Sequence, residues 1–396
     1  MAFGTGNAAF SVFMRPMTED LGWNRLVLSG ALTVQAIGNI AVSPVAGWIL
    51  DRHGPRMIMV FGSVVATGCF LTMGAITEPW QFYLLYTAAT VLGLNELGSL
   101  VTSTTVAKWF VRKRGRALSL GSIGLNVGGA LLAPVVAITI QAVGWRQTWG
   151  VLGIIVACTV LPASILFFRR SPEDMGLLPD GDTPSSEPPH PGQRTAATEQ
   201  QWSLGEALRQ PTTWIIVAAF NLILVAASAM SQHTVAYLED TGMSLVEASA
   251  MFGASHIVTI GAKLTWGAIS DRFPVRYCLI ISSFARIVGL LSLMFATGPA
   301  RIGGFVLGQG VGQGMGLLGP KLWADYYGRT FLGTIRGVLQ PFSVVASLVG
   351  PLFAAYVYDT LGSYNLAFFV IIFCLLISVG LLWVARPPKV PASPVI

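Results

Sequence analysis

The stretch GWILDRHGPR at residues 47–56 returns as GAISDRFPVR at residues 267–276, an offset of 220 positions. The triplets LGW at 21–23 and TGM at 241–243 also stand 220 positions apart, and Pro134 is matched by Pro351 at an offset of 217. Because several landmarks share one nearly constant offset, the sequence predicts two similar halves. In both copies of the longer motif an aspartate, Asp51 or Asp271, is followed at once by an arginine.

The composition is too apolar for a soluble protein. Of the 396 residues, 53% are hydrophobic and only 11% are charged, whereas a soluble domain carries about 25% charged residues. A membrane β-barrel would show alternating segments of about ten residues, but runs such as 369–384 are apolar on every face. Since a helix of about 20 residues crosses a bilayer, the chain has room for roughly a dozen spans.

We expect twelve spanning helices in an all-α membrane protein. They are placed at 2–14, 26–49, 57–77, 80–107, 117–142, 147–168, 212–237, 245–269, 276–297, 301–324, 334–358 and 364–385. The first span covers only about 20 Å of the roughly 30 Å hydrocarbon core, so we expect that part of it lies upstream of Met1.

One long polar segment divides the twelve spans into two sets of six. Residues 171–211 are rich in proline, serine and glycine, a composition typical of a flexible linker. We therefore expect an N-terminal six-helix bundle at 1–170, a cytoplasmic linker at 171–211, and a C-terminal six-helix bundle with a short tail at 212–396. Parallel repeats of this kind are related by a pseudo-two-fold axis, and the substrate binds between them.

The positive charge is distributed unevenly between the two sides of the predicted membrane. Of the 24 Lys and Arg residues, seventeen follow even-numbered spans or lie in the tail, four lie on the opposite side, and three lie within spans. Because positive charge accumulates in cytoplasmic loops, the central linker and the C-terminus are predicted to be cytoplasmic. The net charge of +6 is then a sign of topology, and we expect no nucleic-acid partner.

Signs of enzymatic chemistry are missing from the sequence. The four cysteines lie inside apolar runs without metal-ligand spacing, and the chain has no nucleophile–base constellation and no ATP-binding loop. We expect neither a metal nor a cofactor, and we expect the protein to be a monomer in the lipid bilayer that is not an enzyme.

The repeated motif resembles the G-x-L-x-D-R-x-G-R-K signature of the major facilitator superfamily. The first copy matches it at Gly47, Asp51, Arg52, Gly54 and Arg56. The second copy retains Gly267, Asp271, Arg272 and Arg276, with Pro274 where a glycine is usual. The resemblance implies the major facilitator fold and a secondary transporter that works by alternating access.

A narrower resemblance covers nearly the whole chain. The stretches FSVFMRPM at 10–17, KWFVRKRGRA at 108–117, RSPEDMGLLPDG at 170–181 and GPKLWADYYG at 319–328 are similar to the bacterial monocarboxylate-transporter and oxalate/formate-antiporter group. The resemblance implies transport of small organic anions, coupled to protons or to a second anion. It leaves symport and exchange equally open.

The aspartates of the repeated motif are predicted to act in gating. A carboxylate at the end of one helix accepts hydrogen bonds from the N-terminus of another helix or pairs with arginine. We expect such contacts at Asp51 and Asp271 to close one transport state and to break in the other. The alternative is that they only fix the geometry of the loops.

Lys263 is the main candidate for substrate binding. Ionisable residues within spans are costly and usually functional, and His256 lies two helical turns away on the same face. In the resembling group an arginine near this position is thought to bind a substrate carboxylate; a lysine binds the same group without the bidentate fork. The alternatives are that Lys263 extends towards the cytoplasm and that His256 is an interior residue bonded to a neighbouring helix.

Two further charges lie inside predicted spans. Glu96 is a candidate protonation site or ion-pair partner, and Arg286 is expected to form an interior ion pair, whereas Lys321 is expected to extend from a helix end towards water. Uncharged substrate contacts are expected at Asn7, Asn126, Asn221, Gln313 and Gln340.

The sequence thus favours a carrier of a small organic anion, most simply a monocarboxylate, with protons as the candidate coupling ion. A transporter of a neutral or cationic organic solute, with Glu96 as the determinant, is an alternative on the same fold. A membrane sensor that does not transport is a third, although it would be expected to carry a large soluble domain or a long tail.

Overall fold

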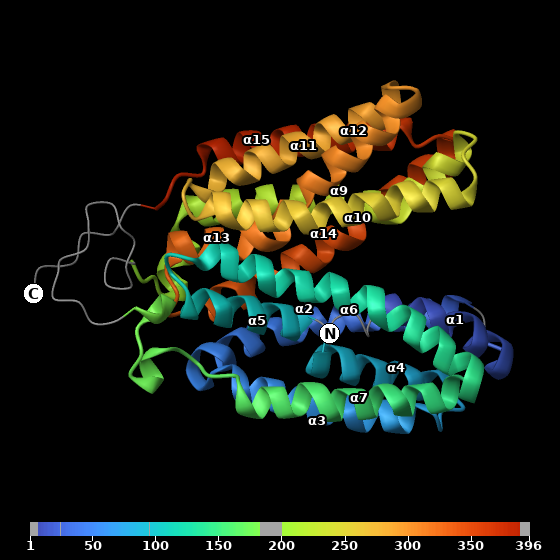
Figure 1. Cartoon of the computed structure of the whole chain (residues 1–396), viewed down its shortest axis with the longest axis horizontal. Helices are drawn as coiled ribbons and strands as arrows, with labels where there is room; N and C mark the ends of the chain where they lie inside the picture. Colours follow the sequence, from blue (N-terminus) through green and yellow to red (C-terminus); the bar gives the residue numbers. More distant parts are fainter. Residues whose placement is uncertain (1–6, 24, 95, 183–199, 389–396) are drawn as a thin grey trace, which may run out of the picture. The chain divides into compact units, whose positions relative to one another are not determined.

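The computed structural model describes residues 7–23, 25–94, 96–182 and 200–388. Within these ranges the side chains of 7–11, 15, 25, 26, 29, 94, 96–99, 125–134, 245, 246 and 249 are not described. The described chain is helical, without β-strands, and Figure 1 shows its course. The elements are α1 Asn7–Leu21, α2 Arg25–His53, α3 Pro55–Met73, α4 Pro79–Thr87, η2 Ala88–Leu94, α5 Glu96–Trp109, α6 Arg114–Val143, α7 Trp145–Leu166, η3 Glu173–Met175, η4 Pro179–Gly181, α8 Leu204–Arg209, α9 Pro211–Asp240, α10 Leu245–Ser270, α11 Val275–Phe295, α12 Gly298–Val311, η6 Gly312–Gly314, α13 Met315–Tyr327, α14 Leu332–Leu361 and α15 Asn365–Val384.

Within the described residues every predicted span overlaps a helix, so the all-α prediction is confirmed. Two spans are interrupted, which the sequence analysis did not anticipate. Span 80–107 consists of α4, the π-helical turn η2 and α5, and span 301–324 consists of α12, the 3₁₀ turn η6 and α13. The second break falls at Gly312–Gly314, where Gln313 leaves helical geometry with ψ at 20°. Glycine pairs and π-bulges are common causes of such breaks.

Seven of the described helices are long and apolar enough to cross a membrane by themselves. They are α2 from Gly30 onward, α3, α7, α9, α11, α14 and α15. The apolar faces that several of them expose, such as Leu352 and Phe373 at 69% and 63%, are what a helix in lipid presents, because hydrocarbon is as apolar as the side chain.

The described chain divides into two compact units. Unit 1 comprises Met1–Val111, Gly121–Pro191 and Arg329–Pro341, and unit 2 comprises Arg112–Leu120, Gly192–Gly328 and Phe342–Ile396. The boundaries fall inside two helices: the first turns of α6 belong to unit 2 and its remainder to unit 1, while the first turns of α14 belong to unit 1 and its remainder to unit 2.

Each unit has its own packing. In unit 1 helices α3 and α7 lie side by side (Figure 1), and the Trp149 ring stacks on Phe13 at 4.0 Å and 16°. In unit 2 α11 packs along α12 and α15. The α11–α12 contact depends on glycine, because a side chain at Gly308 would collide with the backbone of Gly289. Small residues allow this close approach in membranes.

The ends of the polar segment at 171–211 are more ordered than its composition suggests. Residues 171–182 contain η3 and η4, and α8 begins with a capping box in which the Ser203 hydroxyl accepts from Glu206 N. The neighbouring Trp202 is 2% exposed and packs edge-on against Tyr327 at 6.0 Å. A single buried aromatic residue does not alter composition, so the sequence gives little sign of this contact.

Gly47 offers a test of close helix packing in unit 1. A Cβ at Gly47 would overlap the carbonyl oxygen of Gly333 in α14, which is backbone and cannot rotate away. We expect Gly47→Ala to destabilise the protein by about 1–3 kcal/mol, the usual cost of overpacking. Gly68→Ala is the matched control, because a Cβ there meets nothing within 4 Å and alanine favours helix. Equal thermal unfolding temperatures of the two purified variants would contradict the packing.

Candidate functional site

Asp51, at the end of α2, is held by the first turn of α14 within unit 1. Its carboxylate accepts hydrogen bonds from Gly333 N at 3.1 Å, Thr334 N at 2.6 Å and Thr334 Oγ1 at 2.8 Å. Lys108 Nζ, from the end of α5, lies 2.6 Å from Asp51 Oδ1. Both charged side chains are buried, at 6% and 7% exposed. The unpaired backbone N–H groups of a helix N-terminus bind anions, and here the anion is a side chain.

A second ion pair lies next to this contact in unit 1. Arg329 Nη1 donates to the Lys108 carbonyl at 3.0 Å, and Arg329 Nη2 lies 2.6 Å from Glu173 Oε1. Partial burial raises the pKa of Glu173, but a backbone hydrogen bond and the Arg329 guanidinium outweigh it, so the pKa lies below its usual range. A carboxyl with a depressed pKa stabilises the fold above its unfolded pKa, and this contribution is lost as pH falls through the folded pKa.

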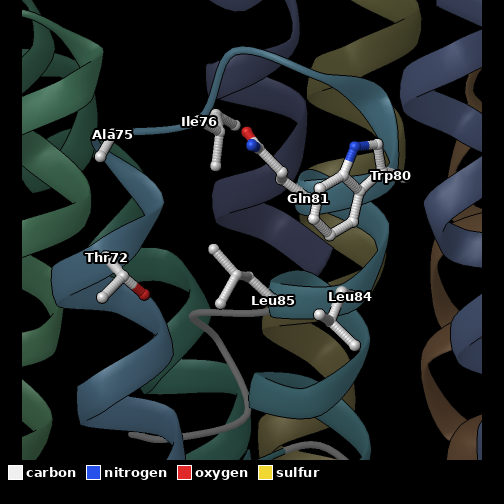
Figure 2. A pocket seen from close by; sticks show the side chains of 7 residues that line it. All are labelled: Thr72, Ala75, Ile76, Trp80, Gln81, Leu84 and Leu85. Carbon is white, nitrogen blue, oxygen red and sulfur yellow. The ribbon is translucent and has the colours of Figure 1, made fainter.

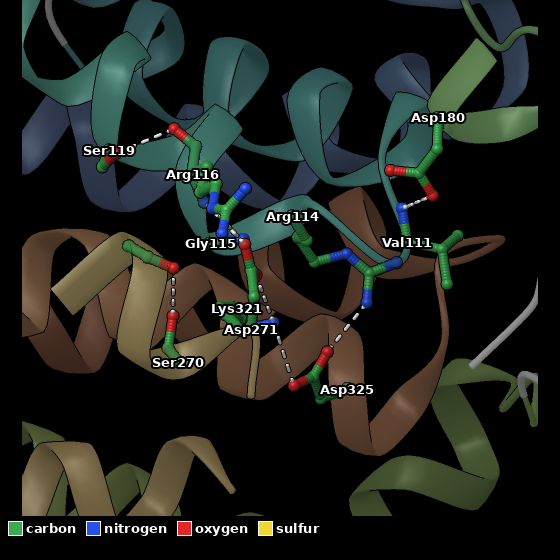
Figure 3. A network of polar contacts seen from close by, with 11 residues as sticks. Val111, Arg114, Gly115, Arg116, Ser119, Asp180, Ser270, Asp271, Lys321 and Asp325 are labelled. Carbon is green, nitrogen blue, oxygen red and sulfur yellow. Dashed lines mark hydrogen bonds and ion pairs between the residues drawn. The ribbon is translucent and has the colours of Figure 1, made fainter. Parts of the chain in front are cut away.

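Asp271 repeats the arrangement in unit 2. Its carboxylate accepts from Gly115 N at 2.6 Å and Arg116 N at 3.2 Å, in the first turn of α6 (Figure 3). A glycine stands one turn before the aspartate in both repeats, and a side chain at Gly267 would meet Ser119 just as one at Gly47 would meet Gly333. The glycine lets a second helix approach, and the aspartate then binds its N-terminus.

A buried charge network extends from Asp271. Lys321 Nζ lies 3.5 Å from both Asp271 Oδ1 and Asp325 Oδ2, and Arg114 Nη1 lies 2.9 Å from Asp325 Oδ1. Figure 3 shows Arg114 and Lys321 converging on Asp325. The side chains of Lys321 and Arg114 are 3% and 1% exposed. The expectation that Lys321 extends towards water is therefore wrong, because two carboxylates hold it in the interior.

The other signature residues have simpler surroundings. Gly54 has φ of 82°, which suits glycine, and directly precedes α3. The Arg52 guanidinium lies 5.3 Å above the Trp48 ring, and that of Arg276 lies 4.6 Å from the Tyr277 ring. Arg56 and Arg272 are exposed.

Lys263 is buried in α10 of unit 2, at 8% exposed. Among the described residues it forms no ion pair or hydrogen bond. Gly267 follows one turn later on the same helix face, and that face meets α6 at Ser119. His256 belongs to the same stripe two turns earlier. The stripe therefore combines an unpaired buried ammonium with an imidazole, on the side of α10 that packs against the start of α6.

Among the described residues, His256 has no interhelical hydrogen bond of the kind named as its alternative. His256 is exposed, and its ring packs edge-on against Phe252 at 4.9 Å. It has no hydrogen bond among the described residues. Both ring nitrogens are thus available to a ligand.

Arg286 is buried in α11, at 2% exposed, as a charge inside a span must be when it does not face lipid. The expected interior ion pair is not found in the described part of the chain. Its Nε and Nη1 have no hydrogen-bond partner.

The expected uncharged contacts are spread over both units. Asn221 in α9 and Gln313 in η6 are half-buried in unit 2, while Gln340 in α14 is half-buried in unit 1. The side chains of Asn7, Asn126 and Glu96 lie outside the described residues. Of the expected substrate contacts, His256 and Lys263 thus share one face of α10, whereas Asn221, Gln313 and Gln340 lie on other elements.

Two cavities lie away from these residues. One of them, in unit 1, has a volume of about 290 Å³. Figure 2 shows its lining, in which Trp80, Gln81 and Leu84 of α4 face Thr72 and Ile76. Another, of about 570 Å³, lies along α3 and is lined by Arg56 of the repeated motif together with Met57, Val60 and Phe61. Both are mostly apolar and lack a predicted substrate contact.

Comparison with known proteins shows the family. The family model described as Major Facilitator Superfamily matches residues 1–320 and 262–395. The chain belongs to the Major Facilitator Superfamily. It is accordingly a multi-pass membrane protein and a secondary transporter, and not an enzyme. The family expected from the repeated motif is thus confirmed.

Several curated proteins are similar to this chain at low identity. The oxalate:formate antiporter of Oxalobacter formigenes is 21% identical over 366 residues, 91% of this chain and 83% of that protein. Monocarboxylate transporter 12 of Rattus norvegicus is 26% identical over 352 residues, 84% and 71% of the two chains. The probable sulfoacetate transporter SauU of Cupriavidus necator is 24% identical over 371 residues, 89% and 83%. The narrower resemblance is confirmed as one to distant relatives.

Solved structures of the Major Facilitator Superfamily share the fold. The transporter FucP in its outward conformation has a TM-score of 0.73 at 12% identity, over 97% of this chain and 96% of that chain. The human organic anion transporter MFSD10 has a TM-score of 0.63 at 14% identity, over 94% and 89%.

The buried network of unit 2 contains residues that sequence reasoning missed. Arg114 and Asp325 were counted only as parts of loops or motifs, although Lys321 and Asp325 stand four residues apart, a spacing that favours a helical ion pair. The family stretches KWFVRKRGRA and GPKLWADYYG contain all three of these residues and Lys108.

Asp325→Asn tests the buried network. The substitution keeps the size of the side chain but deprives Arg114 and Lys321 of a carboxylate in the interior, and breaking a buried pair costs about 3–5 kcal/mol. Asp20→Asn is the control, because Asp20 pairs with Arg146 at 49% and 40% exposed and such surface pairs contribute about 0–1 kcal/mol. Thermal unfolding of both purified variants should show a large decrease only for Asp325→Asn.

Proposed function

We propose that this protein carries a small monocarboxylate across the membrane by alternating access, with proton coupling or anion exchange. The observation that supports the proposal best is the buried ammonium of Lys263 without an ion-pair partner among the described residues. An unpaired charge inside a span is costly and is retained for function, and a carboxylate would neutralise it.

The surroundings of Lys263 favour a singly charged anion. Lysine presents a compact point charge, which binds one carboxylate but does not form the bidentate fork of arginine. His256, two turns away, offers ring nitrogens to the same ligand. Since the stripe offers a single permanent cation, a dicarboxylate would leave one carboxylate without a counter-charge.

The relatives support the same class of substrate. Their names give oxalate and formate, monocarboxylates and sulfoacetate, all of which are small organic anions. At 21–26% identity this supports the class and leaves the particular anion to experiment.

We further propose that the central segment and the C-terminus are cytoplasmic, since the distribution of Lys and Arg favours that orientation. Asp51 and Asp271 would then bind the starts of α14 and α6 at the cytoplasmic ends of the helices. The rest of α14 and the rest of α6 each belong to the unit that does not contain the aspartate. Release of the two helix N-termini by Asp51 and Asp271 would therefore accompany a change between transport states.

The charge of Lys263 links substrate binding to the coupling of transport. Moving an unpaired Lys263 through the membrane interior is costly, whereas the lysine–carboxylate pair is neutral. The loaded carrier would therefore reorient more easily than the empty one, which favours exchange. Glu96 remains the candidate proton carrier, because a carboxyl that gains and loses a proton could offset the charge of Lys263 in an empty carrier.

Ligand-induced thermal stabilisation tests the substrate. The purified protein should be stabilised by formate, acetate or lactate more than by oxalate or succinate at equal ionic strength. At 100 times the dissociation constant a ligand contributes about 2.7 kcal/mol. We expect Lys263→Gln to lose the response, since the neutral amide leaves the carboxylate without its counter-charge.

The matched control is Arg272→Gln, which removes an exposed positive charge nine residues after Lys263, beyond the end of α10. It should keep the response of the natural protein. Equal stabilisation of Lys263→Gln by the same carboxylates would refute the anion site, and stabilisation by amines or sugars alone would refute the substrate class.

Asp51→Asn tests gating. The amide keeps the size of the carboxylate but weakens its bonds to Thr334 and Lys108, and a charged hydrogen bond contributes about 1.5–3 kcal/mol. In proteoliposomes loaded with the carboxylate that stabilises best, the maximal rate should change by about tenfold or more while the half-saturating concentration changes little. Asp174→Asn, at an exposed position, should behave like the natural protein. A loss of affinity at unchanged rate would exclude gating.

A further inference from the structure

Arg286 has a position that the proposed transport site does not explain. It lies near the middle of α11, about 16 Å along the axis from Val275 and about 14 Å from Phe295 at 1.5 Å per residue. It is 2% exposed, and its Nε and Nη1 have no hydrogen-bond partner. A guanidinium at this depth needs a counter-charge or a set of acceptors, since desolvation of an unpaired charge costs several kcal/mol.

The broken helix of unit 2 lies directly against this arginine. A Cβ at Gly312, the first residue of the break, would meet Arg286 Cβ. The break is held in place by α10 and α11, because Trp266 Nε1 donates to the Val311 carbonyl at 2.9 Å and Gly314 N donates to Ser282 Oγ at 3.2 Å. Discontinuous helices of this kind frame ion and substrate sites in transporters.

A second unsatisfied polar group lies on the facing helix. Gln309 in α12 is 2% exposed, and its Oε1 has no hydrogen-bond partner. Gly289 lies one turn after Arg286 on α11, and a Cβ built at Gly289 would be 2.9 Å from the backbone N of Gln309. A direct Arg286–Gln309 hydrogen bond would satisfy the amide oxygen, but it would leave the positive charge without compensation in the membrane.

We propose that Arg286, Gln309 and the break at 312–314 form a binding site for a small monovalent anion, either a halide or a short carboxylate. The guanidinium supplies the charge and the donors on Nε and Nη1, and the amide nitrogen Nε2 of Gln309, rather than its acceptor Oε1, supplies further donors. Gly312 lets the arginine stem pack directly against the break, and the start of α13 directs the positive end of its dipole to the break.

This site is separate from Lys263. The face of α10 that meets α12 carries Ser255 and Val258, which approach Gly310. The face that carries Lys263 continues to Gly267 and meets Ser119 instead. The proposal therefore does not depend on the substrate assigned to Lys263, and its failure would leave that assignment untouched.

Bromide quenching of tryptophan fluorescence tests the site in the full-length protein. The Trp266 indole is bonded to Val311, next to Gly312, so a bromide ion bound at Arg286 would lie beside it. Titration of bromide against gluconate at constant ionic strength should give a saturable component of quenching. The component should be lost in Trp266→Phe and retained in Trp48→Phe, whose indole is 46% exposed.

Substitution of the arginine completes the test. Arg286→Leu should fold, because replacing a buried charge by an apolar side chain is often neutral or stabilising, and should lose saturable quenching. Arg286→Lys should retain it at weaker affinity, and Lys263→Gln should retain it unchanged. Competition by chloride with formate inactive indicates a halide site, whereas competition by formate or acetate indicates a carboxylate site.

Two results would overturn the proposal. One is bromide quenching of the natural protein that increases linearly without a saturable component. The other is a saturable component that persists in Arg286→Leu. If Arg286→Leu does not fold, the same comparison is made with Arg286→Lys, whose bromide affinity should be at least about threefold weaker because lysine lacks the guanidinium fork.

Discussion

Within each unit the same interaction holds two helices together, a carboxylate at the end of one helix bound to the N-terminus of another. Asp51 receives two backbone N–H groups and a hydroxyl from α14, and Asp271 receives two backbone N–H groups from α6. The contact requires close approach of two helices, and this explains the glycine one turn before each aspartate. At Gly47 and Gly267 no side chain holds the partner helix away. The repeated motif therefore supplies close helix packing as well as a charged group.

The charges of the two aspartates are neutralised by different sets of side chains. Around Asp51 one buried lysine, Lys108, balances one aspartate. Around Asp271 a second aspartate, Asp325, is added together with Lys321 and Arg114. In both places buried charges are paired near helix ends, where desolvation would otherwise exceed the Coulombic gain. The same rule marks Lys263 and Arg286 as exceptions, because they are buried away from the helix ends and lack a partner among the described residues.

The sequence predicted what depends on periodicity and composition. Twelve apolar runs gave twelve helical spans, and the motif at 47–56 and 267–276 gave the aspartate contacts, because a carboxylate at a helix end has few other uses. It did not predict the break at Gly312–Gly314, since glycines in a membrane helix serve close packing as often as bending. It also misplaced Lys321, and it gave Arg286 an ion pair that the described residues do not supply. Pairing depends on which helices become neighbours, and that is decided by tertiary contacts rather than by position in a span.

The two unpaired cations differ in what they imply for transport. Lys263 lies on the α10 face that also carries the Gly267 contact with α6, so a ligand bound there would sit one turn from a contact expected to open and close. Arg286 faces the break between α12 and α13 and has no such neighbour. A counter-ion at Lys263 would thus be sensitive to the state of the carrier, whereas one at Arg286 would experience the same surroundings as long as unit 2 moves as a body. The first is suited to a transported anion, and the second to an anion that stabilises the helices that carry it.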